Sequence, residues 1–227
     1  MIRDFISLFF PEICPGCGQS LFKNEHVLCT RCFFKLPGTR FHNESTNPVA
    51  QLFWGRADIS FATALLYYRK GGRVQKLIHR FKYRGMKEIG HFLGECLGRE
   101  LKQSPLLKIP DVIIPVPLHE KKEKKRGFNQ SEIIARGISS VLECEMRSDL
   151  LIRTVQSETQ TRKSRFKRWE NVREIFRVTD REFLKNKHIL LVDDVITTGS
   201  TLEACASVLL EVEGLKVSVA ALGYSVA

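Results

Sequence analysis

Residues 189–201 read ILLVDDVITTGST, and this stretch decides the fold class. A run of four apolar residues is followed by Asp193 and Asp194, and shortly afterwards by a loop of threonine, glycine and serine. Continuous apolar strands are typical of a parallel sheet that is covered on both faces. In such a sheet ligands bind beyond the carboxyl ends of the strands, which is where the two acids would lie.

The acids and the small residues after them indicate a ribose 5-phosphate pocket. Small residues let the backbone approach a ligand closely, and the unpaired N–H groups at the start of a helix suit a phosphate. Two adjacent carboxylates repel phosphate but accept hydrogen bonds from a sugar diol. The sequence has neither the GxGxxG of a dinucleotide site nor the GxxxxGK[ST] of a P-loop. A strand–turn–helix connection with Ser/Thr caps is the alternative, but capping alone does not explain the two acids.

Further apolar runs alternate with helical patterns along the chain. We expect strands at residues 60–68, 111–117, 188–195 and 216–224. Apolar residues recur at helical spacing near residues 74–81, 89–101, 133–141 and 202–212, and a polar loop is expected between residue 117 and the third helix. The fold class is therefore α/β, with a doubly wound, mainly parallel sheet.

Length and charge limit the classes of protein. The 227 residues allow one ordinary domain and a small appendage at ~150 residues per domain. The 36 Lys and Arg exceed the 25 Asp and Glu, which gives a net charge of +11 and suggests an anionic partner. No apolar run approaches ~18 residues, so membrane insertion is not expected. The first residues do not form a convincing signal peptide, so we expect a cytoplasmic protein with reduced cysteines.

Four cysteines form a C-x2-C-x11-C-x2-C pattern, which is Cys14, Cys17, Cys29 and Cys32. Two chelating pairs of thiolates are typical of a closed, structural zinc site, with iron–sulfur or redox use as alternatives. We therefore expect a four-cysteine zinc finger at residues 1–40, a linker at 41–56 and the main domain at 57–227. Whether the finger only holds the N-terminal segment or also docks a protein or DNA stays open.

The acidic-pair stretch resembles the 5-phosphoribosyl-1-pyrophosphate (PRPP) signature of type I phosphoribosyltransferases. LIHRFKYRG at 77–85, IIPVPLHEKKEKKRGFNQSE at 113–132, Gln160 with Asn171-Val172, and the four cysteines extend the resemblance to the ComF/GntX family. This resemblance implies a type I phosphoribosyltransferase fold with an N-terminal zinc finger. By resemblance, Asp193 and Asp194 would hold the ribose hydroxyls and Thr197 to Thr201 the 5-phosphate. The full set implied for PRPP is Asp193, Asp194, Val195, Ile196, Thr197, Thr198, Gly199, Ser200 and Thr201.

Two basic stretches would complete the site. Residues 115–130 follow a predicted strand at the ligand-binding edge and resemble a pyrophosphate loop, with a solvated charged loop as the alternative. Residues 153–173 resemble a flap that closes over PRPP, and a groove for single-stranded nucleic acid or an amphipathic helix are the alternatives. Arg84 is a candidate phosphate contact or simply an exposed helix-end cation. The candidates for pyrophosphate and flap are Lys125, Arg126, Gly127, Asn129, Gln130, Arg165 and Arg84, with Arg126 as a catalytic candidate beside Asp193 and Asp194.

The resemblance implies a PRPP-binding, phosphoribosyltransferase-like protein of natural competence and DNA uptake on the cytoplasmic side. It would transfer a 5-phosphoribosyl group to an unidentified acceptor and release pyrophosphate, using structural zinc and magnesium bound with PRPP. The alternative is a non-catalytic adaptor that binds single-stranded DNA and uses PRPP as a regulatory ligand. The expected partners are PRPP, single-stranded DNA, and a DNA-uptake helicase or other competence proteins.

Overall fold

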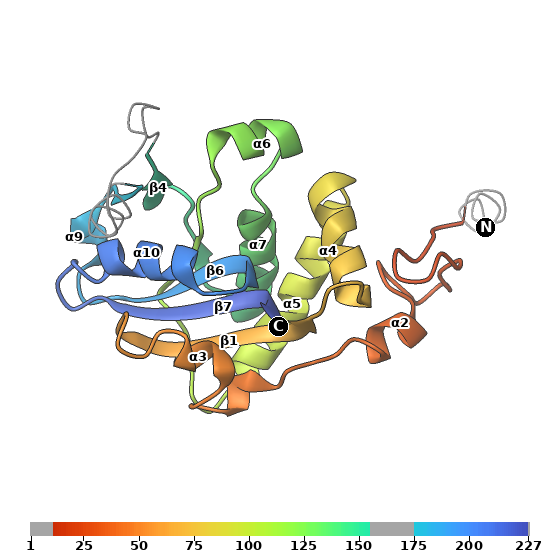
Figure 1. Ribbon diagram of the computed structural model, residues 1–227, viewed down its shortest axis with the longest axis horizontal. Helices are drawn as coiled ribbons and strands as arrows, with labels where there is room; N and C mark the ends of the chain where they lie inside the picture. Colours follow the sequence, from red (N-terminus) through yellow and green to blue (C-terminus); the bar gives the residue numbers. More distant parts are fainter. Residues whose placement is uncertain (1–10, 155–174, 227) are drawn as a thin grey trace.

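A parallel sheet forms the centre of the computed structural model, which describes residues 11–154 and 175–226 (Figure 1). The strand order is β1-β7-β6-β2-β3, and every pairing between neighbours is parallel. The strands are β1 (Ile59–Tyr68), β2 (Val112–Pro115), β3 (Glu145–Met146), β6 (His188–Ile196) and β7 (Lys216–Ser225). The predicted α/β class with a mainly parallel sheet is confirmed. Two short antiparallel strands, β4 (Leu151–Arg153) and β5 (Phe176–Val178), form a separate ribbon that we did not predict.

Both faces of the sheet are covered, which explains the unbroken apolar runs. On one face lie α4 (Arg73–Tyr83), α5 (Lys87–Gln103) and α7 (Gln130–Leu142). On the other lie α10 (Ser200–Leu209), the short α3 (Pro48–Gln51) and α9 (Arg181–Leu184), and the 3-10 turn η1 (Phe41–Asn43). Alternate strand residues serve the two faces, so Ile113 packs under the first layer while Val112 and Ile114 pack under the second.

Helices α5 and α7 touch along a line of glycines. A Cβ on Gly137 would overlap the carbonyl oxygen of His91, and a Cβ on Gly94 would overlap that of Ile134. A Cβ on Gly98 would lie 2.9 Å from the Cβ of Val141, which is also too close. The two backbones are therefore in direct contact, and this contact fixes where α7 places its first turn.

The segment expected as a linker, 41–56, is packed against the sheet. Phe41, Val49 and Phe53 are buried in the same apolar cluster as the strand residues of that face. The Asn47 side chain caps α3 by accepting hydrogen bonds from the backbone N–H groups of Val49 and Ala50, both at 3.0 Å. The polar composition of this segment therefore reflects capping and turns, while its few apolar residues anchor it.

The charged stretch after β2 contains a helix, α6 (Glu120–Arg126), so the prediction of a polar loop was wrong for these residues. Acidic residues occupy its first turn and basic residues its last, which suits the helix dipole. The His119 ring caps its start by accepting from the N–H of Lys121 at 3.1 Å, and Gly127 ends it in the left-handed conformation. No residue of α6 is buried, so the helix has no apolar periodicity to predict it by. Helix α10 begins at Ser200, two residues earlier than expected.

The N-terminal part holds the four cysteines and α2 (Thr30–Phe34). Cys14, Leu28, Cys29 and Cys32 belong to the same apolar cluster as α4, α5 and α7. Within 11–154 and 175–226, no helix combines the length and apolar character needed to cross a bilayer.

Candidate functional site

The acidic pair lies near the carboxyl end of β6 and is held by three elements. The backbone N–H of Asp194 donates to Oδ1 of Asp193 at 2.8 Å. The Ser131 hydroxyl, from the first turn of α7, donates to the same oxygen at 3.1 Å. Lys82 reaches in from α4 and places its Nζ 2.5 Å from Oδ2 of Asp194. Residues more than 60 positions apart in the chain therefore meet at the two carboxylates.

The surroundings of Asp193 favour its protonated form. Burial, and then the neighbouring charge of Asp194, raise the pKa of Asp193 to about 7, although the hydrogen bonds from Asp194 and Ser131 and the charge of Lys82 act in the opposite direction. A protonated carboxyl group gains an O–H donor, keeps acceptor capacity, and avoids a second negative charge beside Asp194. The pair is thus poised to exchange a proton as its surroundings change.

The substitution Asp193→Asn is expected to stabilise the free protein, and more so at alkaline pH. Asn keeps an acceptor oxygen for Ser131 and for the N–H of Asp194 but carries no charge. Because the folded pKa is raised, the folded protein keeps a proton that the unfolded chain has already released, so this contribution to stability is lost as pH rises through about 7. Thermal unfolding should show Asp193→Asn melting several degrees above the wild type at pH 8 and much closer to it at pH 5, since ~1 kcal/mol shifts Tm by roughly 2–4 °C at this size. An equal difference at both pH values would contradict a titrating Asp193.

The loop after β6 turns at Gly199 into α10. Gly199 adopts a φ of 74°, where a side chain would be strained, and begins the helix without any side-chain cap. Thr197, Thr198, Ser200 and Thr201 are exposed around this turn, and the hydroxyls of Thr198 and Ser200 lie 2.9 Å apart. The first N–H groups of α10 and these hydroxyls form a set of donors next to the acidic pair, as a phosphate requires. Val195 is half-buried, and the Ile196 side chain is buried in the apolar cluster, so only its backbone faces this loop.

Arg126, at the end of α6, packs against α4. Its guanidinium donates to Oε1 of Gln130 and to the Tyr83 hydroxyl at 3.4 Å, and it lies over the Tyr83 ring at 5.3 Å from the centroid. Lys125 and Arg84 are exposed, on α6 and at the end of α4. Arg165 lies outside the described residues, as does the rest of the expected flap from 155 to 173.

The two amides beside Arg126 have structural partners. Asn129 caps α7 by accepting from the N–H of Ser131 at 3.1 Å and donates to the carbonyl of Val116 at 3.0 Å. Gln130 is buried and donates to the carbonyl of Phe128 at 3.2 Å. Asn129 ties the start of α7 to the residue after β2, Gln130 holds Arg126, and Gly127, in the left-handed conformation, allows the turn between α6 and α7. Their visible role is to position Ser131 and Arg126.

Sequence reasoning missed Lys82 and Ser131. Both lie in stretches that carry the family resemblance, yet each reaches the acids only through tertiary contact. Lys82 stands among the cations of α4, and Ser131 reads as an ordinary residue of a helix start. No local spacing distinguishes either of them.

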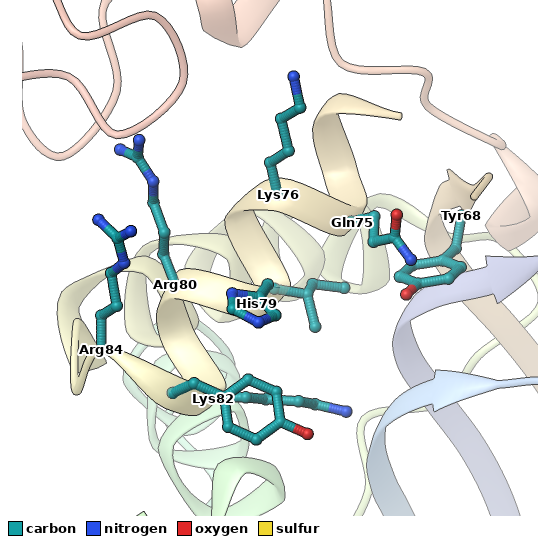
Figure 2. A pocket seen from close by; sticks show the side chains of 9 residues that line it. Tyr68, Gln75, Lys76, His79, Arg80, Lys82 and Arg84 are labelled. Carbon is teal, nitrogen blue, oxygen red and sulfur yellow. The ribbon is translucent and has the colours of Figure 1, made fainter. Parts of the chain in front are cut away.

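A pocket of about 630 Å³ opens along α4 (Figure 2). The ionisable side chains that line it are lysine, arginine, histidine and tyrosine, and none is a carboxylate. Figure 2 shows Arg80 and Arg84 pointing together to one side and Lys82 extending to the other, toward the strands. The basic members of the lining are Lys76, His79, Arg80, Lys82 and Arg84. The pocket therefore attracts anions and meets the acidic pair at Lys82.

The four cysteine sulfur atoms lie within 4.8 Å of one another. The N–H groups of Cys29 and Gly16 point at Sγ of Cys14, at 3.3 and 3.4 Å, and despite burial these and other hydrogen bonds lower the pKa of Cys14 to about 7. A Cβ at Gly16 would come within 2.8 Å of Sγ of Cys32, so only glycine fits this turn. Four converging sulfur atoms supported by N–H donors could hold a metal ion such as zinc.

Comparison with known proteins agrees with this architecture. The model of the phosphoribosyl transferase domain family matches residues 129–224. DNA utilization protein YhgH of Shigella flexneri is 31% identical over 201 residues, which cover 87% of this chain and 78% of that protein. Competence protein F of Haemophilus influenzae is 35% identical over 59% of this chain and 60% of its own length. Competence protein ComFC of Bacillus subtilis is 29% identical over 88% of this chain and 72% of its own length.

The matched family region begins at Asn129 and so takes in Ser131, the acidic pair and the loop into α10. The relatives extend the likeness over most of the chain. A parallel sheet of this order, the four-cysteine cluster and these relatives show that the chain belongs to the ComF family of competence-related proteins, which carry a type I phosphoribosyltransferase fold.

Proposed function

We propose that this protein binds PRPP together with magnesium at the carboxyl end of β6 and transfers its 5-phosphoribosyl group to an acceptor, with release of pyrophosphate. The observation that carries the proposal is the junction of two carboxylates with an uncapped helix start. Carboxylates accept hydrogen bonds from the ribose hydroxyls, while the N–H groups and hydroxyls of 197–201 donate to the 5-phosphate. Each half of the site matches one half of a ribose 5-phosphate.

The remaining groups have roles in this scheme that follow from their charge. Arg126, which lies over the Tyr83 ring, and the exposed Lys125 and Arg84 would balance the charge of the pyrophosphate leaving group. Magnesium bound with PRPP would add charge neutralisation there. The four cysteines would hold a structural zinc, because four protein ligands leave no coordination position for a substrate.

Calorimetric titration of the metal-loaded protein with PRPP and magnesium tests the binding step. We expect micromolar affinity for the wild type and a loss of at least about 100-fold in Asp193→Asn/Asp194→Asn, since two hydrogen bonds to charged acceptors are each worth ~1.5–3 kcal/mol. The matched control is Glu211→Gln/Glu213→Gln, which removes two carboxylates from exposed positions just beyond the end of α10. Folded wild type that does not bind would overturn the proposal, and pyrophosphate release that depends on an added acceptor would establish transfer.

A second candidate function, binding of single-stranded DNA as an adaptor of the uptake machinery, is favoured by one surface. Arg73 of α4 and the cations Arg31 and Lys35 line a common pocket with Phe22, which is 79% exposed. Cations paired with exposed rings suit a flexible strand, whose phosphates and bases they can contact. The relatives are named for DNA utilization and competence, which supports a setting in DNA uptake. In this candidate function PRPP would be a regulatory ligand, the location cytoplasmic, and the partners a DNA-uptake helicase or other competence proteins.

Binding of a labelled single-stranded oligonucleotide at several salt concentrations checks this candidate. We expect the affinity to fall at least tenfold between 50 and 200 mM salt, as is typical when several phosphates are contacted. Replacing Arg31, Lys35 and Arg73 by alanine should weaken binding and flatten the salt dependence. Salt-insensitive binding, or equal slopes for both proteins, would rule out this surface as the DNA site.

A further inference from the structure

Lys82 is a donor already in place at the acidic pair. Its Nζ lies 2.5 Å from Oδ2 of Asp194, and both side chains are largely enclosed, at 18% and 15% exposure. Phe81 and Ile78, its neighbours on α4, are buried, so the helix that carries Lys82 is firmly seated. The contact is therefore part of the packed structure rather than a chance pairing of surface charges.

The ion pair competes with the sugar for the same acceptor. Oδ1 of Asp193 already accepts from Ser131 and from the N–H of Asp194. Oδ2 of Asp194, a further acceptor of the pair, is taken by the ammonium group. A sugar hydroxyl that uses this oxygen must displace the Lys82 ammonium, and separating two enclosed opposite charges is unfavourable unless the ammonium finds another anion.

The pocket on α4 is where such an anion would arrive. Lys82 belongs to its lining and extends to the side opposite Arg80 and Arg84, toward the strands (Figure 2). Because no carboxylate lines the pocket, an anionic group of a ligand bound on the Lys82 side would attract the ammonium. The lysine side chain has four rotatable bonds and can swing between Asp194 and a phosphate without moving α4. A phosphorylated sugar thus brings its own counter-ion for Lys82, whereas a neutral sugar does not.

We propose that Lys82 determines which sugars bind to the acidic pair. Its ion pair with Asp194 disfavours unphosphorylated sugars, whereas the phosphates of a phosphorylated ligand attract the ammonium away from Asp194. The inference rests on the proposed ribose 5-phosphate site and adds a selection step to it. Without phosphate, the ion pair stays closed. With phosphate, Lys82 changes partners, and Asp194 becomes free to accept from the ribose hydroxyl.

The test compares one charged and one neutral ligand on Lys82→Met, which keeps an unbranched apolar stem of similar length. Titrations of the full, metal-loaded chain use magnesium-PRPP and methyl β-D-ribofuranoside, the latter followed by NMR up to 100 mM. We expect Lys82→Met to bind PRPP about tenfold or more weaker and the riboside about tenfold tighter than the wild type. The matched control is Lys102→Met, which removes an ion-paired lysine on α5 outside the pocket and should leave the binding of both ligands unchanged.

The opposite signs of the two effects separate this role from a structural one, which would weaken both ligands. Lys82→Arg should restore the exclusion of the riboside, and circular dichroism verifies that each variant is folded. The inference fails if the riboside binds Lys82→Met no better than the wild type, including when neither binds, or if both ligands change in the same direction. If the folded wild type does not bind PRPP at all, the proposed function fails instead.

Discussion

Replacing Cys14 by serine is expected to abolish the metal binding proposed for the four cysteines and to loosen the described N-terminal segment. A four-thiolate site loses most of its affinity for metal when one of its ligands is removed. Structural zinc contributes ~10–16 kcal/mol of apparent binding free energy in small peptides. Cys14 is fully buried, and the sulfur cluster lies in the same apolar cluster as α4 and α5. We therefore expect Cys14→Ser to hold less than a tenth of one metal per chain and to melt well below the wild type.

Two measurements check this effect. The metal content is read with a chromogenic chelator after a mercurial reagent has released the metal, and thermal unfolding is followed with and without EDTA. EDTA should lower the Tm of the wild type toward that of Cys14→Ser and leave the variant unchanged. Cys96→Ala is the control, because Cys96 is a buried thiol of α5 outside the cluster. A Cys14→Ser protein that retains one metal per chain would show that the four sulfur atoms are not the site.

Gly137→Val is expected to lower the stability of the fold strongly. The new side chain would overlap the carbonyl oxygen of His91 and the backbone of Glu95 and Gly94, and backbone atoms cannot move aside as a flexible side chain would. Separating α5 from α7 would open the apolar cluster between them and displace Ser131 from the acidic pair. Overpacking of this kind typically costs ~1–3 kcal/mol and occasionally more, and here the clash with backbone places it at or above the upper end.

Urea unfolding compares this variant with two others. Arg136→Val places the same β-branched residue on the exposed side of α7 and should cost ~1 kcal/mol or less through helix propensity and one surface ion pair. Gly137→Ala is the milder test if the valine variant does not accumulate. A midpoint for Gly137→Val within experimental error of the wild type would mean that the two helices separate without loss of stability.

Much of the fold could be predicted because the parallel sheet leaves a strong trace in the sequence. Runs such as 189–192 are apolar throughout since both faces of β6 are covered, and the helical spacing of Val74, Leu77, Ile78 and Phe81 reappears as the buried face of α4. The helix α6 left no such trace, because it is exposed on all sides and held by its caps and charges. The packing of 41–56 was missed because its anchors are widely spaced among turn residues.

The residues of the candidate site also differ in how far the sequence could predict them. Asp193, Asp194 and the loop to Thr201 are neighbours in sequence, so their chemistry could be interpreted locally. Lys82 and Ser131 come from other elements, and only the fold brings them to the acids. Asn129 has a donor and an acceptor like any ligand-binding amide, and only its two hydrogen bonds to the chain reveal its structural use.

The position of β7 has a consequence for how the protein forms during synthesis. This strand comes last in the described chain, yet it lies between β6 and β1, and its register joins Tyr68 to Ser225. On the ribosome, α5, α7, β2 and β6 can assemble from earlier residues, while β1 must wait for a partner made about 150 residues later. Such long-range pairing slows folding and exposes unpaired strand edges in the meantime. Nascent chains that stop before residue 216 should therefore be the form on which chaperones act.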